Sequence, residues 1–347
     1  MPNNNNFAPY MQKILIIQTA FIGDVVLATA MLEKLARFYP DAEIDFLVRK
    51  ENESLLDNNP HLHEVLVWNK KEKKLRNLFS MLGQIRKRKY DIVINLQRFF
   101  ATGFLTAFSG GKQKIGFDKN PLSFLFSKKL KHVIASGDGN KHEVERNNDL
   151  IASFTDDSFS KPKLYPSEKD LAAVERYTYI PYVTMTPNSV WFTKQYPPEK
   201  WVDLMNNFPP EYKIYLLGGK ENIADCEQLK NSSSNANAEV LTGKLSFLQS
   251  AALMKTAAMN YVNDSAPLHF ASAMNAPVTA IFCSTVPAFG FTPLSDRSYI
   301  VETKEILSCR PCGLHGYKAC PEGHFKCALT IETEQLIQTL TRSSAIA

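Results

Sequence analysis

Short apolar runs alternate with amphipathic stretches along most of the chain. The first run, Ile14–Ile17, contains no polar position and ends at Gln18 and Thr19. Such a run is typical of a strand buried on both faces of a sheet. Apolar residues then recur at spacings of three and four from Val25 to Ala36. This spacing predicts a helix that packs one side against the sheet.

The same alternation recurs in two series. The strands expected after the first one are Glu43–Val48, Glu64–Trp68, Tyr90–Leu96 and Lys114–Phe117, then Tyr182–Met185, Tyr212–Leu217, Met259–Val262 and Val278–Phe282. Strands that alternate with helical stretches indicate parallel sheets with crossover helices. A polar, turn-rich stretch at Thr155–Pro166 separates the two series. With a usual domain size of roughly 150 residues, the pattern predicts an α/β protein with domains at residues 1–160 and 161–347.

Composition narrows the class of protein. The hydrophobic fraction of 44% is ordinary for a soluble globular chain. No apolar run approaches the ~20 residues that a membrane-spanning helix needs. The first ten residues are rich in asparagine and lack a basic start followed by an apolar core, so they do not resemble a signal peptide. We therefore expect a frayed tail and a cytoplasmic location.

Positive charge is concentrated in the first part of the chain. Residues 1–140 contain 21 Lys+Arg against 13 Asp+Glu, whereas the remainder contains 19 against 22. Much of this charge lies in residues 70–89, where it flanks Leu75, Leu78, Phe79, Leu82 and Ile85 at helical spacing. Such a helix can lie against an anionic membrane or an anionic acceptor. It can equally be a solvated basic face over an ordinary core stripe, and the spacing leaves both interpretations open.

One carboxylate stands where a parallel sheet usually binds its ligand. Gly23 and Asp24 close the loop between the first strand and its helix. Loops at the carboxyl ends of parallel strands line the ligand crevice of an open α/β sheet. Asp24 is therefore either a catalytic group or a helix cap.

Three loops of the second series suit a nucleotide. The segment Thr186–Lys194 supplies hydroxyls, backbone N–H groups and a lysine for a diphosphate. Gly218–Glu221 allows close backbone approach and offers a carboxylate to ribose hydroxyls. Asp264–His269 begins a helix whose first N–H groups can bind an anion. Because neither a Walker-type lysine nor G-x-G-x-x-G is present, we expect a nucleotide bound without either phosphate loop.

A cysteine-rich stretch follows the second series. Cys309, Cys312, Cys320 and Cys327 are spaced C-x2-C-x7-C-x6-C, with two histidines interleaved. Four thiols at these spacings can bind a structural zinc ion. Disulfides are not expected in the cytoplasm. The alternative is a set of free thiols in a packed loop.

Four blocks of the chain together resemble one family. They are Gly23–Leu32 (GDVVLATAML), His142–Arg146 (HEVER), Lys194–Pro197 leading to Trp201, and Asn263–His269 (NDSAPLH). In this order and spacing they are similar to the lipopolysaccharide heptosyltransferases of glycosyltransferase family 9. The resemblance runs from about Lys13 to Leu340, which is nearly the whole chain.

The resemblance implies a GT-B fold, with two Rossmann-like domains facing each other across a cleft. Residues 1–160 would bind the acceptor and residues 161–347 the nucleotide sugar, with the last helix able to pack back on the first domain. The implied reaction is inverting transfer of heptose from ADP-heptose to the inner core of lipid A-core lipopolysaccharide. By position, Asp24 would be the catalytic base and Lys194 the phosphate-binding group. The implied substrate-binding residues are Gly23, Thr186, Ser189, Glu221, Asp264, Ser265, Ala266, Pro267 and His269.

Cofactors and partners follow from the same resemblance. The chain has no D-x-D motif to hold a metal on a diphosphate, so we expect metal-independent transfer, with structural zinc at the four cysteines as the one metal considered. The enzyme would be peripheral on the inner face of the inner membrane, docked through its basic N-terminal domain, with no nucleic acid partner. Two alternatives remain. One is a GT-B enzyme for another nucleotide sugar, either another glycosyltransferase or an epimerase, and the other is a non-catalytic nucleotide-binding or membrane-docking protein that has kept the fold.

Overall fold

The computed structural model describes residues 13–134 and 140–344 and divides the chain into two compact units. The predicted N-terminal tail lies outside the described residues. The first unit extends to Ile134 and resumes over Glu143–Lys163, and the second consists of Ala135–His142 and Leu164–Ala347. The chain passes from the first unit to the second for the last time between Lys163 and Leu164. The predicted boundary, after residue 160, lies three residues earlier. We describe each unit by itself.

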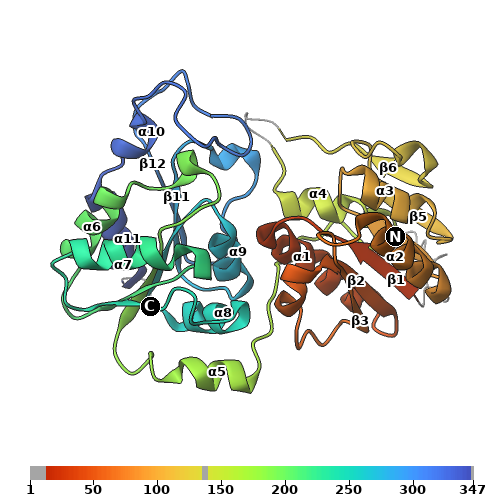
Figure 1. Cartoon of the computed structure of the whole chain (residues 1–347), viewed down its shortest axis with the longest axis horizontal. Helices are drawn as coiled ribbons and strands as arrows, with labels where there is room; N and C mark the ends of the chain where they lie inside the picture. The colour runs from red at the N-terminus through yellow and green to blue at the C-terminus, as the bar shows by residue number, and fades with distance from the viewer. Residues whose placement is uncertain (1–12, 135–139, 345–347) are drawn as a thin grey trace, which may run out of the picture. The chain divides into compact units, whose positions relative to one another are not determined.

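The first unit contains one parallel sheet. Its strands are β1 (Lys13–Ile17), β2 (Glu43–Arg49), β3 (Glu64–Trp68), β4 (Ile92–Asn95), β5 (Gln113–Phe117) and β6 (Lys128–Leu130), in the order β3-β2-β1-β4-β5-β6. Its helices are α1 (Ile22–Phe38), α2 (Lys74–Arg88), α3 (Phe100–Ala107) and α4 (Glu143–Asp149), with shorter 3-10 turns at Lys50–Leu55, Ser123–Leu125 and Ala152–Phe154 (Figure 1). The predicted strands are confirmed, whereas β6 and α3 were not predicted.

The first strand is buried on both faces, as its composition predicts. Leu15 and Ile17 pack in one core cluster with Met81 and Ile85 of α2. Successive strand residues point to opposite faces, so the equally buried Ile14 faces the other side of the sheet. On that side α1 packs against α4.

In the basic helix α2, only part of the apolar stripe that the sequence predicts is buried in the core. Ile85 is fully buried, and Leu78 and Leu82 only pack against the edge of the core. Leu75 and Phe79, by contrast, are 72% and 59% exposed. The stripe interpretation is therefore wrong for the first half of this helix.

The second unit repeats the arrangement. Its strands are β7 (Tyr182–Thr186), β8 (Lys213–Leu216), β9 (Ala238–Val240), β10 (Met259–Asn263), β11 (Val278–Phe282) and β12 (Ser298–Glu302), in the order β12-β11-β10-β7-β8-β9. Its helices are α5 (Glu168–Glu175), α6 (Pro198–Asn206), α7 (Ile223–Ser232), α8 (Phe247–Thr256), α9 (Ala266–Ala273), α10 (Lys326–Leu329) and α11 (Thr333–Ser344), with 3-10 turns at Phe192–Lys194, Lys220–Asn222 and Pro287–Phe289.

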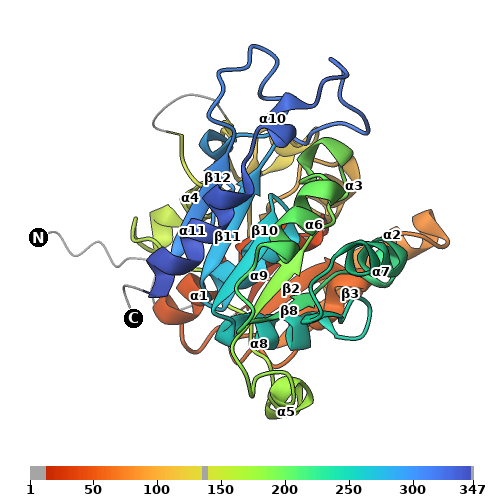
Figure 2. The same cartoon turned by 90° about the vertical axis from the view of Figure 1, so that its left-hand side faces the viewer.

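Helices cover both faces of the second sheet. Side chains of α6, α7 and α11 share one core cluster on one face, and α8 and α9 lie on the other (Figures 1 and 2). The last helix, α11, packs against α6, β10 and β12 of its own unit. Among the described residues, no helix combines the length and the apolar character needed to cross a bilayer.

Both sheets have the same topology. Counted within its own unit, each strand order is 3-2-1-4-5-6, the arrangement of a Rossmann-like domain. The direction of winding reverses between β1 and β4 in the first unit and between β7 and β10 in the second. Ligands of open α/β sheets bind outside the carboxyl ends of the strands at such a switch point. We call these two places the first and the second switch point.

A buried lysine fastens the end of the first unit to α1. Lys34 is 1% exposed. Its ammonium group donates to the carbonyl oxygens of Asp156 at 2.5 Å and Ser158 at 2.8 Å, and lies 3.0 Å from the Asp156 carboxylate. The hydroxyl of Ser158, together with Lys34, lowers the pKa of Asp156 to about 2.

Replacing this lysine should destabilise the first unit. We expect Lys34→Met to lower its free energy of unfolding by about 2 kcal/mol, because buried charge-assisted hydrogen bonds are lost. Arg37→Met is the matched control, since Arg37 is exposed and lies 3.7 Å from the same carboxylate. It should cost less than about 0.5 kcal/mol.

The same ion pair predicts a dependence on pH. The pKa of Asp156 is depressed, so its ion pair stabilises the fold at neutral pH and is lost as the pH falls from about 4 to about 2. Denaturant unfolding should therefore show the Lys34→Met deficit shrinking over that range, and equal deficits for both variants would contradict the assignment.

Candidate functional site

At the second switch point, one asparagine ties together the loops that follow the two central strands. Asn263, the last residue of β10, donates its side-chain amide to the carbonyl oxygen of Pro187 at 2.7 Å. Its side-chain oxygen accepts from the backbone N–H of Tyr196 at 2.9 Å. Both bonds are buried, so the loop after β7 has a fixed position beside the loop after β10.

An ion pair joins the two predicted phosphate loops. The ammonium nitrogen of Lys194 lies 2.7 Å from a carboxylate oxygen of Asp264, and both side chains are largely buried. The hydroxyl of Thr285, after β11, donates to the same carboxylate oxygen at 2.6 Å. Because an ammonium group has three donors, Lys194 keeps the capacity to bind a phosphate oxygen while Asp264 holds it at the edge of the sheet.

A buried hydroxyl at the same edge has no protein partner. Thr186 is the last residue of β7 and is 3% exposed. Its Oγ1 atom makes no hydrogen bond among the described residues. Leaving a buried polar group unpaired costs roughly 1–3 kcal/mol, and an oxygen of a bound ligand would remove that cost. The neighbouring Ser189 is partly exposed, and its carbonyl oxygen accepts from Gln195 at 2.7 Å.

The start of α9 offers fewer donors than the sequence suggests. Ser265 occupies the N-cap position, and Ala266 and Pro267 begin the helix. Pro267 has no N–H, and the N–H of Leu268 donates to the carbonyl oxygen of Ser265 at 3.1 Å. An anion at this turn would therefore meet mainly the N–H groups of Ser265 and Ala266. His269, one turn further, is buried.

Glu221 lies on the same edge because β8 pairs with β7. It belongs to the 3-10 turn Lys220–Asn222 and is exposed. Its carboxylate folds back over Gly219, where an added Cβ would come within 2.4 Å of a carboxylate oxygen. Only glycine at position 219 leaves room for this conformation.

The cysteine-rich stretch supports the lysine, a role that local sequence patterns did not reveal. The hydroxyl of Thr193 accepts from the backbone N–H of Tyr317 at 2.7 Å and from the hydroxyl of Ser284 at 3.0 Å. A Cβ on Gly316 would come within 2.7 Å of the Thr193 hydroxyl and 3.1 Å of Cγ of Lys194. Gly316 also has a φ of +77°, which L side chains rarely adopt. The loop thus approaches the Lys194 segment as closely as glycine permits.

Arg310 attaches this loop to the end of β11. Its guanidinium donates to the carbonyl oxygens of Cys283 and Thr285, both at 2.7 Å, and pairs with Glu302 at 2.5 Å. Because Thr285 in turn donates to Asp264, Arg310 helps to fix the position of the Lys194–Asp264 ion pair. Burial raises the pKa of the Cys283 thiol well above its usual range.

The structure does not support the expected zinc site. Thiols around one zinc ion lie roughly 4 Å apart, because each Zn–S bond is about 2.3 Å. Among the described residues, the group of three or more potential ligands with atoms within 4.8 Å of one another is Asp45, His63 and Glu64, in the first unit. There Arg88 already pairs with both carboxylates, at 3.6 Å and 2.6 Å. The thiols of Cys309, Cys312, Cys320 and Cys327 form no disulfide. Of the alternative, free thiols in a packed loop, the packing is only partial, because most residues between Cys312 and Cys327 are exposed and Gly316 is the buried exception.

At the first switch point, Asp24 lies inside the helix and not at its cap. Phe21 occupies the N-cap position, and α1 begins at Ile22, so Gly23 and Asp24 are its second and third residues. Asp24 is partly exposed. A carboxylate in the first turn is favoured by the helix dipole. The N-cap interpretation of Asp24 is therefore wrong.

Two cations lie beside this switch point, at the carboxyl ends of β2 and β3. The amine of Lys70 donates to the carbonyl oxygen of Thr19 at 3.1 Å and to its hydroxyl at 2.6 Å, and lies 4.7 Å from the centre of the Trp68 ring. Burial, together with the charge of Arg49, lowers the pKa of Lys70 to about 8. The buried Nε of Arg49 has no hydrogen-bond partner among the described residues. Neighbouring cations that are partly desolvated favour an anion between them.

Sequence reasoning missed this pair because Lys70 stands in a run of exposed lysines. The useful signal was position: Arg49 is the last residue of β2, and Lys70 follows the end of β3 by two residues. Both therefore lie at the carboxyl edge of the sheet. The density of charge around Lys70, taken alone, predicted that its side chain would be exposed to solvent.

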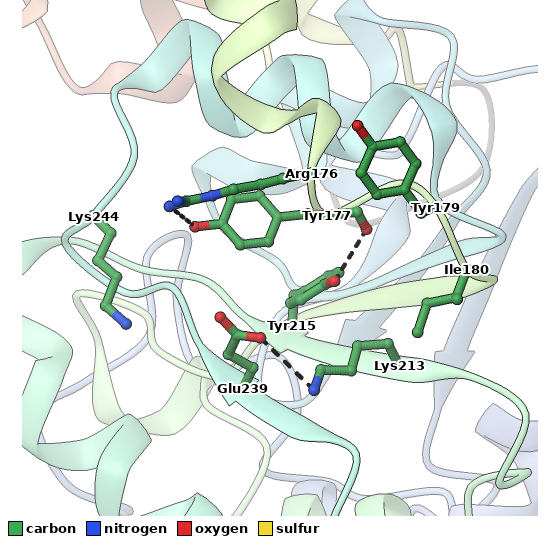
Figure 3. A pocket seen from close by; sticks show the side chains of 8 residues that line it. All are labelled: Arg176, Tyr177, Tyr179, Ile180, Lys213, Tyr215, Glu239 and Lys244. Carbon is green, nitrogen blue, oxygen red and sulfur yellow. Dashed lines mark hydrogen bonds and ion pairs between the residues drawn. The ribbon is translucent and has the colours of Figure 1, made fainter.

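A cavity of about 540 Å³ lies elsewhere in the second unit (Figure 3). It is lined by Arg176, Tyr177, Tyr179, Ile180, Lys213, Tyr215, Glu239 and Lys244. Lys213 pairs with Glu239 at 3.7 Å, and the hydroxyl of Tyr215 donates to the carbonyl oxygen of Tyr177 at 3.0 Å. Much of its lining precedes β7 or begins β8, at the ends of the strands opposite to the switch point. We assign no ligand to this cavity.

Comparisons with known proteins identify the family and the fold. The model of glycosyltransferase family 9 (heptosyltransferase) matches residues 78–317. Lipopolysaccharide heptosyltransferase 3 of Escherichia coli is 28% identical over 283 residues, covering 76% of this chain and 82% of that protein.

Two solved structures share the fold. A family 9 glycosyl transferase from Veillonella parvula superimposes with a TM-score of 0.84 at 20% identity, covering 97% of this chain and 98% of that one. The ADP-heptose lps heptosyltransferase II of E. coli gives a TM-score of 0.80 at 19% identity, covering 97% and 100%. The expected GT-B class, with two Rossmann-like units, is confirmed.

The close approach of Gly316 to the lysine segment can be tested directly. We expect Gly316→Ala to cost about 3 kcal/mol of stability, because strain at positive φ adds to a clash with Thr193. Gly323→Ala is the matched control: its φ is +69° but no atom lies within 4 Å of the added Cβ, so only about 1 kcal/mol is expected. Hydrogen exchange followed by mass spectrometry should show faster exchange over residues 192–194 in the first variant alone. Equal behaviour of the two variants would contradict the contact.

Proposed function

Because the chain belongs to glycosyltransferase family 9, the heptosyltransferase family, we propose that it transfers heptose from ADP-heptose to the inner core of lipopolysaccharide. Membership makes it a glycosyltransferase, so the epimerase and non-catalytic alternatives are not retained. The names of the similar E. coli proteins support both the donor and the acceptor. The observation that carries the proposal is the Lys194–Asp264 pair beside the unpartnered hydroxyl of Thr186.

The donor diphosphate would bind at the second switch point. Lys194 offers a positive charge, Thr186 a buried hydroxyl, and the turn at Ser265 and Ala266 two backbone N–H groups. Glu221, on the next loop along the edge, is placed to accept from ribose hydroxyls. Ser189, Asp264, Pro267 and His269 complete the proposed binding set.

Asp24 would act as the general base. An acceptor hydroxyl is a poor nucleophile at neutral pH, and a carboxylate within hydrogen-bond reach can take its proton during attack on the anomeric carbon. A single displacement of this kind inverts the configuration at that carbon. The transition state resembles an oxocarbenium ion, with the bond to ADP breaking.

Negative charge develops on the departing diphosphate. Lys194 and the N–H groups at the start of α9 are fixed in advance, so their stabilisation requires little reorganisation when the charge develops. Since the chain contains no D-x-D motif, we propose that these groups do the work that a divalent metal does in enzymes carrying that motif. Transfer should accordingly persist in EDTA.

The acceptor would bind at the first switch point. Arg49 and Lys70 converge there, and Lys70 remains mostly charged at pH 7 because its pKa is about 8. Together they suit a phosphate or carboxylate group of the acceptor. A lipid-anchored acceptor would place the enzyme on the cytoplasmic face of the inner membrane as a peripheral protein.

The donor assignment predicts selective nucleotide binding. In calorimetric titration we expect ADP to bind more tightly than UDP, and Lys194→Ala to weaken ADP binding roughly tenfold to a hundredfold, because a charge-assisted bond to phosphate is lost. Lys220→Ala is the matched control, since Lys220 is an exposed lysine on the same edge, and it should bind as the wild type does. Preference for UDP would instead indicate another nucleotide sugar.

The base assignment predicts a split between kinetic constants. Asp24→Asn should lower kcat by about 10²- to 10⁴-fold while leaving ADP binding unchanged. Arg49→Ala provides the contrast: we expect a higher KM for the acceptor with kcat nearly preserved, because it removes a binding group only. Steady-state transfer assays with both substrates varied separate the two. Near-wild-type kcat in Asp24→Asn would rule out its role as base.

A further inference from the structure

Helices α2 and α3 expose a cluster of large apolar side chains. Phe79 contacts Phe104 with ring centres 5.7 Å apart, and Phe104 contacts Phe108 at 4.9 Å. Phe100 and Phe104 are four residues apart and share one face of α3, and Phe108, the C-cap residue, follows at the same spacing. We call Leu75, Phe79, Phe100, Phe104 and Phe108 the aromatic face. Outside Phe104, its members are 44% to 72% exposed.

Burying such side chains in the core would stabilise the fold, so their exposure needs another explanation. Monomeric soluble proteins seldom expose contiguous apolar patches without an interaction that uses them. Within this helix pair, the core is already filled by Met81, Ile85 and Leu105. The aromatic face is thus surplus to the packing of the unit.

Positive charge flanks the aromatic face on the side of α2. Helix α2 contains no acidic residue, and Lys74, Arg76 and Lys87 on it are exposed. Arg86, also on α2, donates to the carbonyl oxygen of Phe108 at 3.5 Å, which places its charge beside the rings. Aromatic side chains flanked by lysine and arginine are typical of surfaces that enter the headgroup region of anionic membranes.

The position of the face links it to the first switch point. Asn77 of α2 donates to the carbonyl oxygen of Asn69 at 3.1 Å, which holds the helix against the loop that carries Lys70. On the other side, α3 begins at Phe100, five residues after the end of β4. The two loops that lead into the aromatic face are therefore loops of the proposed acceptor site.

We propose that the aromatic face is the membrane-docking surface of this protein and that it inserts into the headgroup layer of a bilayer containing anionic lipid. The proposal rests on the proposed function only for the identity of the lipid-anchored acceptor that docking would bring to the first switch point. A second copy of the chain is a poor occupant, because pairing the two faces would bring their basic residues together.

Vesicle binding tests the proposal. Wild-type protein should co-sediment with vesicles of phosphatidylethanolamine and phosphatidylglycerol, and far less with phosphatidylcholine vesicles. The double variant Phe79→Ser, Phe100→Ser should bind the anionic vesicles at least about tenfold more weakly, because two inserted side chains are lost. Tyr179→Ser with Ile180→Ser is the matched control, since these residues are 76% and 53% exposed in the second unit, and it should bind as the wild type does.

A charge variant separates insertion from attraction. Lys74→Gln with Lys87→Gln should weaken vesicle binding and reduce its dependence on salt. Both positions are exposed, so the melting temperature should not change. Unaltered vesicle binding in the serine variant, or an equal loss in the Tyr179 and Ile180 control, would overturn the proposal. A wild-type dimer in size-exclusion chromatography that the serine variant dissociates would assign the face to a second copy instead.

Activity measurements distinguish failure of this proposal from failure of the proposed function. With an acceptor from which the lipid chains have been removed, the serine variant should transfer sugar at the wild-type rate. With the same acceptor anchored in anionic vesicles, its rate should fall by about as much as its vesicle binding. Wild-type protein that binds vesicles but transfers no heptose would reject the proposed function and leave the docking surface standing. Equal rates of both proteins on the vesicle-anchored acceptor would reject the docking surface.

Discussion

Parallel pairing of the central strands decides where this protein can do chemistry. In each unit two neighbouring strands, β1 with β4 and β7 with β10, end at the same edge while their crossover helices leave toward opposite faces. Only there does the backbone open without exposing the interior of the sheet. The groups that we assign to catalysis or binding lie at or just beyond the carboxyl ends of the strands in these two sheets. Thr186 and Arg49 end their strands, Asp264 follows β10, and Asp24 lies in the first turn of the helix after β1.

Electrostatic support at the second switch point extends through several contacts. Lys194 is paired with Asp264, which accepts from Thr285, whose carbonyl oxygen accepts from Arg310. A largely buried ammonium group needs such a counterion, since desolvation otherwise favours its neutral form. The cysteine-rich loop packs on the same segment through Gly316. We infer that this loop contributes to the site by close packing, which restricts the position of the Lys194 segment.

In the first unit, the proposed anion site lies next to an amphipathic surface. Lys70 is fixed by Thr19 and by the ring of Trp68, so its charge stays at the edge of the sheet. The helix that follows turns Phe79 outward and Ile85 inward. One short stretch of chain thus supplies both a binding cation and part of the proposed membrane contact.

The sequence by itself determined the strands other than β6, β9 and β12, about half of the helices, the α/β class in two series, and the segments that hold Asp24, Lys194 and Asp264, because these follow from local periodicity and turn chemistry. Only the tertiary structure decided which side chains meet. Lys194 and Asp264 are seventy positions apart and pair at 2.7 Å because β7 lies beside β10. Likewise, Leu75 and Phe79 have core spacing, yet they are exposed because Met81, Ile85 and Leu105 already fill the space between α2, α3 and the sheet. Periodicity states which residues share a side of an element, whereas strand order and packing volume determine what that side faces.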